Sequence, residues 1–215
     1  MSASAPWSGL RRKLVAILRG LAPQDAREVV SALLEAGFEA IEIPLNSPEP
    51  FRSIEIARKI APKNCLIGAG TMLTVADVDH LHSAGGNLMV SPNVEPTVIR
   101  GARELGMVAV PGVFTATEAL LAISAGASAL KFFPASVLGP GGIGAIRAVL
   151  PAGTEIVAVG GVSDKDFDAY ALAKINAFGL GSSLFRPGDS AAVVARRAKA
   201  TIAAYDTAFG IEGRE

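Results

Sequence analysis

Two charged side chains stand inside short apolar segments, where a charge is costly unless it has a partner or a task. Lys131 lies in Ser128-Ala129-Leu130-Lys131-Phe132-Phe133-Pro134, and Glu42 lies in Ala40-Ile41-Glu42-Ile43-Pro44. A lysine removed from water has a lowered pKa and is therefore partly neutral near pH 7. A neutral amine attacks carbonyl carbon, so a Schiff-base enzyme is the first hypothesis. The alternative is an edge-strand lysine whose ammonium reaches water along its aliphatic stem.

In a closed barrel of strands neither charge could lie on an edge strand, because such a barrel has none. Lys131 and Glu42 would then face either the barrel interior or the helix layer, where each offsets the other's desolvation if they converge. The pair would supply an amine nucleophile and a general acid/base, and buried titratable groups tend to mark functional sites. A purely structural ion pair is the alternative.

Two more polar side chains follow apolar runs. Arg19 comes after Ile17-Leu18 and could form paired hydrogen bonds to a carboxylate, although a surface arginine explains it equally well. Thr71 comes after Gly68-Ala69-Gly70, which would place a hydroxyl beside glycines that allow close backbone approach. The same residues could form a helix-entry turn.

Glycines gather after the last two apolar runs, in Val159-Gly160-Gly161 and in Gly179-Leu180-Gly181-Ser182-Ser183. In an eight-stranded α/β barrel these loops commonly hold phosphate through backbone N–H groups. Glycine suits this task because a side chain would block the approach of the phosphate oxygens. The pattern predicts a phosphorylated ligand.

The elements that must position these residues alternate along the whole chain. Eight apolar runs read as strands: 14–18, 40–45, 66–69, 88–91, 108–111, 129–133, 156–159 and 177–181. Amphipathic segments lie between them, at 25–36, 48–60, 74–84, 95–105 and 115–125, and several begin with a cap residue such as Thr74, Thr115 or Ser163. Gly37, Gly85, Gly106 and Gly126 would each end a helix.

This order predicts a single α/β domain, a (β/α)8 TIM barrel over 14–208, with an N-terminal extension at 1–13 and a C-terminal tail at 209–215. A doubly wound open sheet is the competing fold. The sixth helix is the weakest, because Gly139-Pro140-Gly141-Gly142 leaves only Ile143–Leu150. Ile211-Glu212-Gly213-Arg214 matches a protease cleavage sequence used with recombinant proteins, and it is left out of the fold prediction.

Composition narrows the class of partner. Half of the 215 residues are hydrophobic, the formal net charge is zero and no basic run occurs, so nucleic acid and membrane surfaces are not expected partners.

Residues 1–13 lack an apolar stretch of signal-peptide length, and a single Cys65 excludes an internal disulfide, so we expect a cytoplasmic protein. His80 and His82 do not share a helix face, and no metal site or cofactor is predicted.

Five segments together resemble the class I 2-keto-3-deoxy-6-phospho-sugar acid aldolases, and the resemblance runs from about Leu14 to Ala208. They are Leu14-Val-Ala-Ile-Leu-Arg-Gly20, Glu42-Ile-Pro-Leu-Asn-Ser-Pro48, Gly68-Ala-Gly-Thr71, Lys131-Phe-Phe-Pro-Ala135 and Gly179-Leu-Gly-Ser182. The resemblance implies a homotrimeric barrel enzyme that cleaves a phosphorylated 2-keto-3-deoxy acid to pyruvate and glyceraldehyde 3-phosphate without metal.

The resemblance also implies a role for each matching residue. Lys131 would form the Schiff base and Glu42 would move protons. The remaining positions would bind substrate: Thr71, Pro92 and Phe133 the pyruvyl part, and Gly160, Gly161, Gly181 and Ser182 the phosphate.

Two branches of this family differ in where the carboxylate-binding arginine stands. The 6-phosphogluconate branch carries it on the second strand, where this chain has Asn46. Arg19 on the first strand resembles the 6-phosphogalactonate branch, which makes that epimer the expected substrate and leaves activity on both open. The rival hypotheses are a phosphate-binding barrel with isomerase or transferase chemistry, and a non-catalytic phosphosugar-binding protein.

Overall fold

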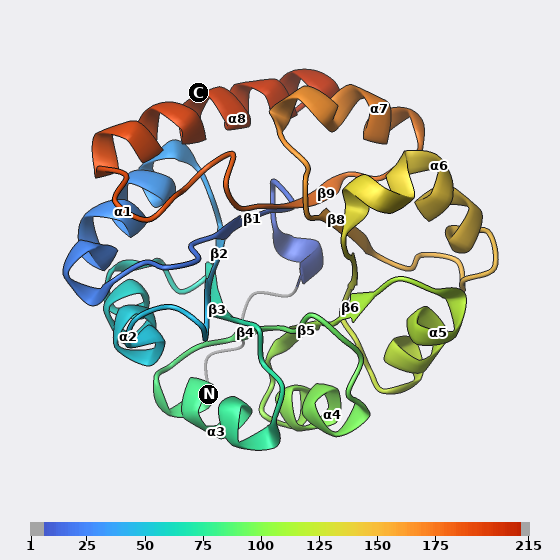
Figure 1. Ribbon diagram of the computed structural model, residues 1–215, viewed down its shortest axis with the longest axis horizontal. Helices are drawn as coiled ribbons and strands as arrows, with labels where there is room; N and C mark the ends of the chain where they lie inside the picture. Colours follow the sequence, from blue (N-terminus) through green and yellow to red (C-terminus); the bar gives the residue numbers. More distant parts are fainter. Residues whose placement is uncertain (1–6, 212–215) are drawn as a thin grey trace.

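The computed structural model describes residues 7–211, and it forms a ring of helices around a barrel of parallel strands (Figure 1). The sheet order is β5-β4-β3-β2-β1-β9-β8-β7-β6. The strands are β1 Leu14–Ile17, β2 Ala40–Pro44, β3 Leu66–Gly70, β4 Leu88–Val90, β5 Val108–Val110, β6 Gly112–Val113, β7 Leu130–Phe132, β8 Ile156–Val159 and β9 Ala177–Leu180. The predicted (β/α)8 barrel is confirmed.

Nine strands arise from eight because the fifth barrel strand is interrupted at Pro111. β5 pairs with β4, whereas β6 pairs with β7, so the two ends of the sheet order are consecutive pieces of one strand. Proline has no N–H for the ladder, which explains the break. The Pro111 carbonyl still accepts a hydrogen bond from the Lys131 N–H at 2.9 Å and helps to close the ring.

Helices begin and end where the cap residues indicate. They are α1 Pro23–Ala36, α2 Pro50–Ile60, α3 Val75–Ser83, α4 Pro96–Glu104, α5 Ala116–Ser124, α6 Ala135–Arg147, α7 Phe167–Leu172 and α8 Ala191–Phe209, with short 3-10 helices at Trp7–Gly9 and Asp164–Asp166. The predicted caps Thr74, Thr115 and Ser163 each accept a backbone N–H. All four predicted stop glycines have left-handed φ angles: Gly37, Gly85, Gly106 and Gly126.

The prediction for the sixth helix was wrong. α6 spans Ala135–Arg147, and only Gly139, with φ 63° and ψ 172°, departs from helical geometry inside it. A first turn precedes Gly139, and Pro140 starts the second part. Proline fits the first position of a helix because the N–H that it lacks would have no partner there. The glycine-rich run therefore bends this helix without removing its first half.

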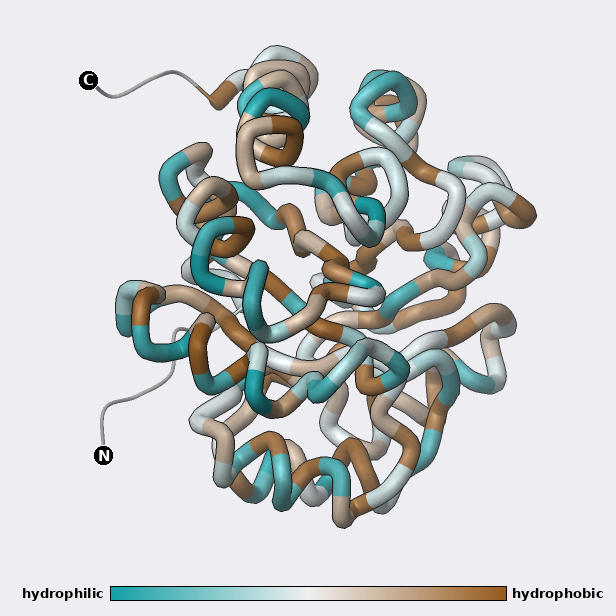
Figure 2. The backbone as a smooth tube through the Cα atoms, turned by 60° about the vertical axis from the view of Figure 1, so that its left-hand side comes forward, coloured by the Kyte–Doolittle hydropathy of each residue, from teal (hydrophilic) through white to brown (hydrophobic). Residues whose placement is uncertain are grey.

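Apolar side chains form two layers on either side of the barrel wall. One layer lies between strands and helices, and its largest buried members include Phe38, Phe132, Phe167 and Phe178. The other fills the barrel with alternate strand residues such as Val15 and Ala40, and Trp7 packs in this interior layer. Along the surrounding helices, hydrophilic and hydrophobic residues alternate, as expected for elements with one buried face (Figure 2).

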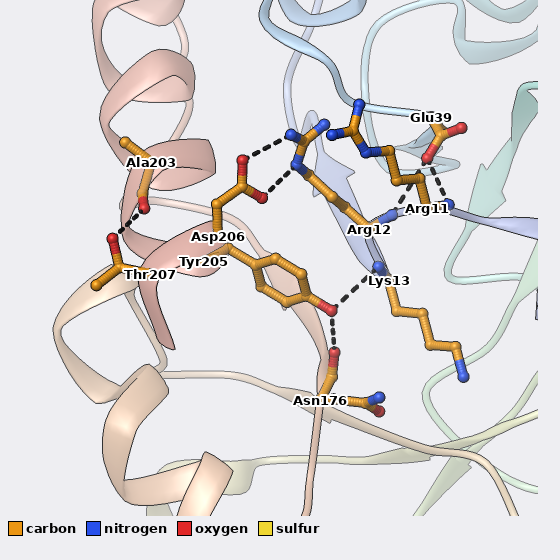
Figure 3. Close-up of polar contacts among 9 residues, drawn as sticks. All are labelled: Arg11, Arg12, Lys13, Glu39, Asn176, Ala203, Tyr205, Asp206 and Thr207. Atoms are coloured by element: carbon orange, nitrogen blue, oxygen red, sulfur yellow. Dashed lines mark hydrogen bonds and ion pairs between the residues drawn. The ribbon is translucent and has the colours of Figure 1, made fainter. Parts of the chain in front are cut away.

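The start of β1 is fixed to the end of α8 by polar contacts (Figure 3). Arg12 forms two 2.6 Å hydrogen bonds to Asp206, and this contact raises the pKa of the guanidinium. The Tyr205 hydroxyl donates to the Asn176 carbonyl at 2.6 Å and accepts from the Lys13 N–H at 3.4 Å. These contacts tie the first and last barrel strands together.

Within residues 7–211, no helix has the length and apolar character needed to cross a membrane.

Candidate active site

A pocket of about 440 Å³ opens at the end of the barrel where the strands finish. Chemistry sits at this end of such barrels because loops from all strands meet there. The pocket lining contains all ten catalytic and substrate-binding residues predicted from the sequence: Arg19, Glu42, Thr71, Pro92, Lys131, Phe133, Gly160, Gly161, Gly181 and Ser182. The fold therefore brings all ten together, and their individual roles stay predictions.

Lys131 and Glu42 both point into the barrel rather than toward the helices. Ala129 and Ala40, each two residues earlier in the chain, belong to the interior layer, and in extended chain side chains two apart share a face. Lys131 is 7% exposed and Glu42 is 3% exposed. β7 pairs with strands on both sides, so the edge-strand alternative for Lys131 is wrong.

Burial moves the two pKa values toward each other. Desolvation lowers the pKa of Lys131 to about 8, against the opposing charge of Glu42. Desolvation raises the pKa of Glu42 to about 7, against the charges of Lys131 and Arg19. The Lys131 ammonium also lies 5.0 Å from the centroid of the Phe133 ring. Near neutral pH the site therefore holds an amine that is partly neutral beside a carboxyl that is partly protonated.

Glu42 owes its position to Gly70 on the neighbouring strand. A Cβ at Gly70 would lie 2.0 Å from Glu42 Oε2, so the carboxyl group occupies the space of a missing side chain. Glu42 Oε2 is buried and makes no hydrogen bond within the described residues. An unpartnered buried carboxyl oxygen that faces a pocket is free to contact a ligand.

Gly70→Ala should therefore displace the Glu42 carboxyl group without removing it. We expect a fall of at least tenfold in turnover, because a general acid/base works only within hydrogen-bond reach. Steady-state kinetics would measure this, with Gly141→Ala as a matched control, since nothing lies within 4 Å of a Cβ at Gly141. Turnover that survives Gly70→Ala unchanged would contradict this positioning role.

Arg19 is held by the residue that stands where the other branch has its arginine. Arg19 Nη1 donates to Asn46 Oδ1 at 2.7 Å, and the adjoining Gly20 N–H donates to the Ser47 hydroxyl at 2.9 Å. Two neighbouring hydrogen bonds thus join the loop after β1 to the loop after β2. The Arg19 guanidinium, supplied from the loop after β1, therefore reaches the loop that follows β2.

Thr71 has an unusual backbone conformation, with φ 58°. A β-branched residue at a left-handed φ is strained, and such strain collects at functional sites. Pro92 reaches the same pocket through a close approach of backbones, since a Cβ at Gly112 would lie 2.3 Å from the Pro92 carbonyl oxygen. Backbone geometry places both Thr71 and Pro92 beside the buried pair.

The opposite side of the pocket is lined by backbone. Gly160 and Gly161 have φ angles of 93° and 73°, and a Cβ at Gly161 would lie 2.6 Å from the Ser136 hydroxyl oxygen. Four N–H groups of these loops find no acceptor within residues 7–211: those of Gly161, Val162, Ser182 and Ser183. Free N–H groups around a concave surface suit an anion.

Reasoning from the sequence missed several lining residues: Ile17, Val159, Val162, Ser163, Gly179, Ser183 and Arg186. Arg186 is the only charged residue among them. It lies six residues beyond the end of β9, whereas the prediction considered only residues close to the end of each strand. Gly179 and Ser183 do belong to the glycine-rich segment already noted.

No metal site accompanies this pocket in the described part of the chain. Among residues 7–211, no group of three or more His, Cys, Asp or Glu side chains could hold a metal ion. His80 and His82 are both exposed on α3.

Comparison with known proteins identifies the family. A model of the KDPG and KHG aldolases matches residues 9–196. The chain belongs to this aldolase family. The predicted resemblance is confirmed, and members of this family are carbon–carbon lyases.

Individual aldolases of the family are closely similar. The chain is 65% identical over 205 residues to a probable 2-dehydro-3-deoxy-6-phosphogalactonate aldolase of Rhizobium meliloti (strain 1021), covering 95% of this chain and 97% of the relative. It is 46% identical to the 2-dehydro-3-deoxy-6-phosphogalactonate aldolase of Escherichia coli (strain K12), covering 89% and 94%. A solved structure of native KDPGal superposes with a TM-score of 0.89 at 45% identity, covering 92% of this chain and 96% of that one.

Proposed function

We propose that this chain is a class I aldolase that cleaves 2-dehydro-3-deoxy-6-phosphogalactonate to pyruvate and D-glyceraldehyde 3-phosphate through an imine on Lys131. The observation that carries the proposal is the buried pair itself: Lys131 is 7% exposed, Glu42 is 3% exposed, and both line one pocket. Burial lowers the pKa of Lys131 to about 8 and raises the pKa of Glu42 to about 7. Relatives named for this substrate share 65% and 46% of their aligned residues with the chain.

The first half of the reaction forms the imine. The neutral Lys131 amine attacks the C2 ketone, and loss of one water leaves a protonated imine. At pH 7 about a tenth of an amine with a pKa of 8 is neutral, against about one in 2,500 for an ordinary lysine. The lowered pKa of Lys131 thus increases the reactive fraction by about two orders of magnitude.

The second half breaks the carbon–carbon bond. Glu42 takes the proton of the C4 hydroxyl, directly or through water, and the C3–C4 electron pair moves into the imine as the aldehyde forms. Glu42 then returns a proton to C3 of the enamine, and one water hydrolyses the imine to release pyruvate. A carboxyl group with a pKa near 7 can both accept and donate a proton at neutral pH.

The rest of the pocket orients the substrate. Arg19, the cation whose charge acts on both members of the pair, would bind the C1 carboxylate with Thr71 and Pro92 beside it. Phe133 would cover the pyruvyl carbons. Gly160, Gly161, Gly181 and Ser182 would hold the phosphate at the far side of the pocket, where the N–H groups of Gly161 and Ser182 are free to donate.

An isomerase or transferase with a phosphate-binding barrel would explain the glycines after β8 and β9. Such an enzyme would give Lys131 and Glu42 no shared role in catalysis. A non-catalytic binding protein would not explain why Lys131 is buried, since burying its charge destabilises the fold. Chemistry that needs both an amine and a proton shuttle accounts for more of the pocket.

Pyruvate release from the two epimeric phospho-acids tests the choice of substrate. We expect the galactonate epimer to be cleaved with the higher kcat/KM, because Arg19 and Asn46 follow the pattern of that branch. A coupled lactate dehydrogenase assay on both epimers would measure the ratio. Preference for the gluconate epimer would contradict the assignment of substrate and leave the aldolase chemistry intact.

We infer that the enzyme is a homotrimer, following the family resemblance. Six exposed large apolar side chains lie on α3, α4, α5 or adjoining loops: Leu73, Val75, Leu105, Phe114, Leu120 and Leu121. Grouped apolar exposure of this kind is typical of a subunit interface. A solution mass of about three times the 22.0 kDa chain would support the trimer, and a monomer mass would contradict it.

We also place the enzyme in the cytoplasm, because a substrate that carries carboxylate and phosphate charges does not cross a membrane unaided. Cell fractionation with an antibody would test this location.

A further inference from the structure

Arg186 lies at the side of the pocket that the proposed function assigns to phosphate. It lines the same cavity as Ser182 and Ser183, and its side chain is exposed to that cavity's solvent. The backbone N–H groups of this loop carry only partial charge, whereas a phosphate monoester carries close to two negative charges at pH 7. An added full positive charge would match the ligand far better than dipoles alone.

The side chain of Arg186 is fixed at one end and unpaired at the other. Its Nε donates to the Ser182 carbonyl at 3.1 Å, which holds the guanidinium against the loop whose N–H groups are free. Neither terminal Nη atom has an acceptor within the described residues 7–211. An arginine anchored through Nε keeps two N–H-bearing nitrogens directed at a planar or tetrahedral anion.

The nearby carboxylate of Asp189 has Arg197, rather than Arg186, as its main ion-pair partner. Asp189 accepts the Arg186 backbone N–H at 2.8 Å, but both of its carboxylate oxygens are bound by the Arg197 guanidinium. The hydrogen bond from Arg197 is the main reason that the pKa of Asp189 lies below its usual range. The charge of Arg186 also acts on Asp189, but more weakly than that of Arg197, and within residues 7–211 no hydrogen bond joins the Arg186 guanidinium to this carboxylate.

The loop is also pinned from the other side. A Cβ at Gly20, which has φ 82°, would lie 2.7 Å from Cγ of Pro187, so the loop after β1 packs directly against the residue that follows Arg186. This contact fixes the backbone from which the Arg186 side chain extends, and the Nε hydrogen bond to the Ser182 carbonyl holds the guanidinium itself. Preorganised charge binds an anion at a lower entropic cost than a mobile side chain.

We propose that Arg186 binds the phosphate group of the substrate, as a cation added to the backbone N–H groups of the loops after β8 and β9. Lys131 and Arg19 are the other cations that line the pocket, and the charges of both act on Glu42. Arg186 would thus determine affinity for phosphorylated substrates. This inference rests on the proposed function and names a residue that acts at its far end.

Arg186→Gln tests the assignment. We expect KM for the phosphorylated substrate to rise about 10- to 100-fold, which corresponds to the loss of charge-assisted hydrogen bonds, while kcat changes much less. Inhibition by inorganic phosphate should weaken by a similar factor. Arg186→Lys, which keeps the charge but not the paired geometry, should recover part of the loss.

Pyruvate separates this test from the test of the proposed function, because pyruvate has no phosphate. Trapping of pyruvate by borohydride should proceed in Arg186→Gln at close to the wild-type rate. Arg52→Gln, which removes an exposed arginine paired with Glu55 on α2, is the matched control and should leave KM unchanged. If KM and phosphate inhibition in Arg186→Gln stay within twofold of wild type, Arg186 does not bind phosphate. If wild type fails to trap pyruvate, the proposed function fails instead.

Discussion

Lys131→Met should abolish turnover and leave a folded protein. Methionine fills a similar volume but cannot form an imine, so no route to carbon–carbon cleavage through the enzyme remains. The variant loses a charge whose burial is costly, and we expect its melting temperature to equal or exceed that of wild type. Pyruvate release and thermal unfolding, measured side by side, would check both parts.

Lys59→Met, at an exposed position on α2, is the control for a lysine-to-methionine change and should keep wild-type turnover. Turnover by Lys131→Met above the uncatalysed rate would rule out an obligatory imine. A loss of activity that is accompanied by unfolding would leave the lysine's chemistry unaddressed, and Lys131→Arg would then supply a charged alternative.

Imine formation should depend on pH as the Lys131 pKa of about 8 requires. Only the neutral amine attacks, so the rate of pyruvate trapping should rise about tenfold per pH unit below 8 and level off above it. An ordinary lysine would continue to gain rate up to about pH 10.

Glu42→Gln has the second largest expected effect and separates two steps that Lys131→Met removes together. The amide cannot accept or return a proton, so kcat should fall by about 10²- to 10⁴-fold. Imine formation with pyruvate should persist, because the Lys131 amine is retained. Rapid-quench measurement of the imine together with steady-state kcat would show this split.

The same substitution should stabilise the protein in a defined pH window. Burial raises the folded-state pKa of Glu42 to about 7, above the ordinary value of 4.5 for a glutamate. As the pH rises from 4.5 to 7 the unfolded carboxyl ionises while the folded one resists, so the wild type loses about 3 kcal/mol of stability. Glu42→Gln lacks this loss, and its gain in the free energy of unfolding should grow over that window and stay constant above pH 7. If the difference in the free energy of unfolding between Glu42→Gln and wild type were the same at pH 5 and pH 8, the raised pKa of Glu42 would be contradicted.

Glu42 and Lys131 could be predicted because each places a full charge in an apolar strand. Periodicity and turn residues were enough to order eight strands, and the glycines after the last two runs indicated where an anion would bind. These signals are local, since each depends on a few neighbouring residues. Barrel closure then brings distant strand ends together without further information.

Contacts between elements were harder to predict from the sequence. The fit of Glu42 into the space beside Gly70 depends on the register of β2 and β3, and the bond from Arg19 to Asn46 joins two loops. Arg186 stands beyond a strand end, where only the fold of its loop directs it to the pocket. The sixth helix was predicted too short because Gly139 and Pro140 act as a bend inside it rather than as its boundary.

Reduction with borohydride in the presence of pyruvate, followed by peptide mass spectrometry, tests the central claim most directly. The claim is that the buried amine of Lys131 forms an imine with a 2-keto acid. We predict a single carboxyethyl adduct on Lys131, absent without pyruvate and absent from Lys131→Met. A folded wild-type protein that yields no adduct, or that carries the adduct on another lysine, would contradict the claim.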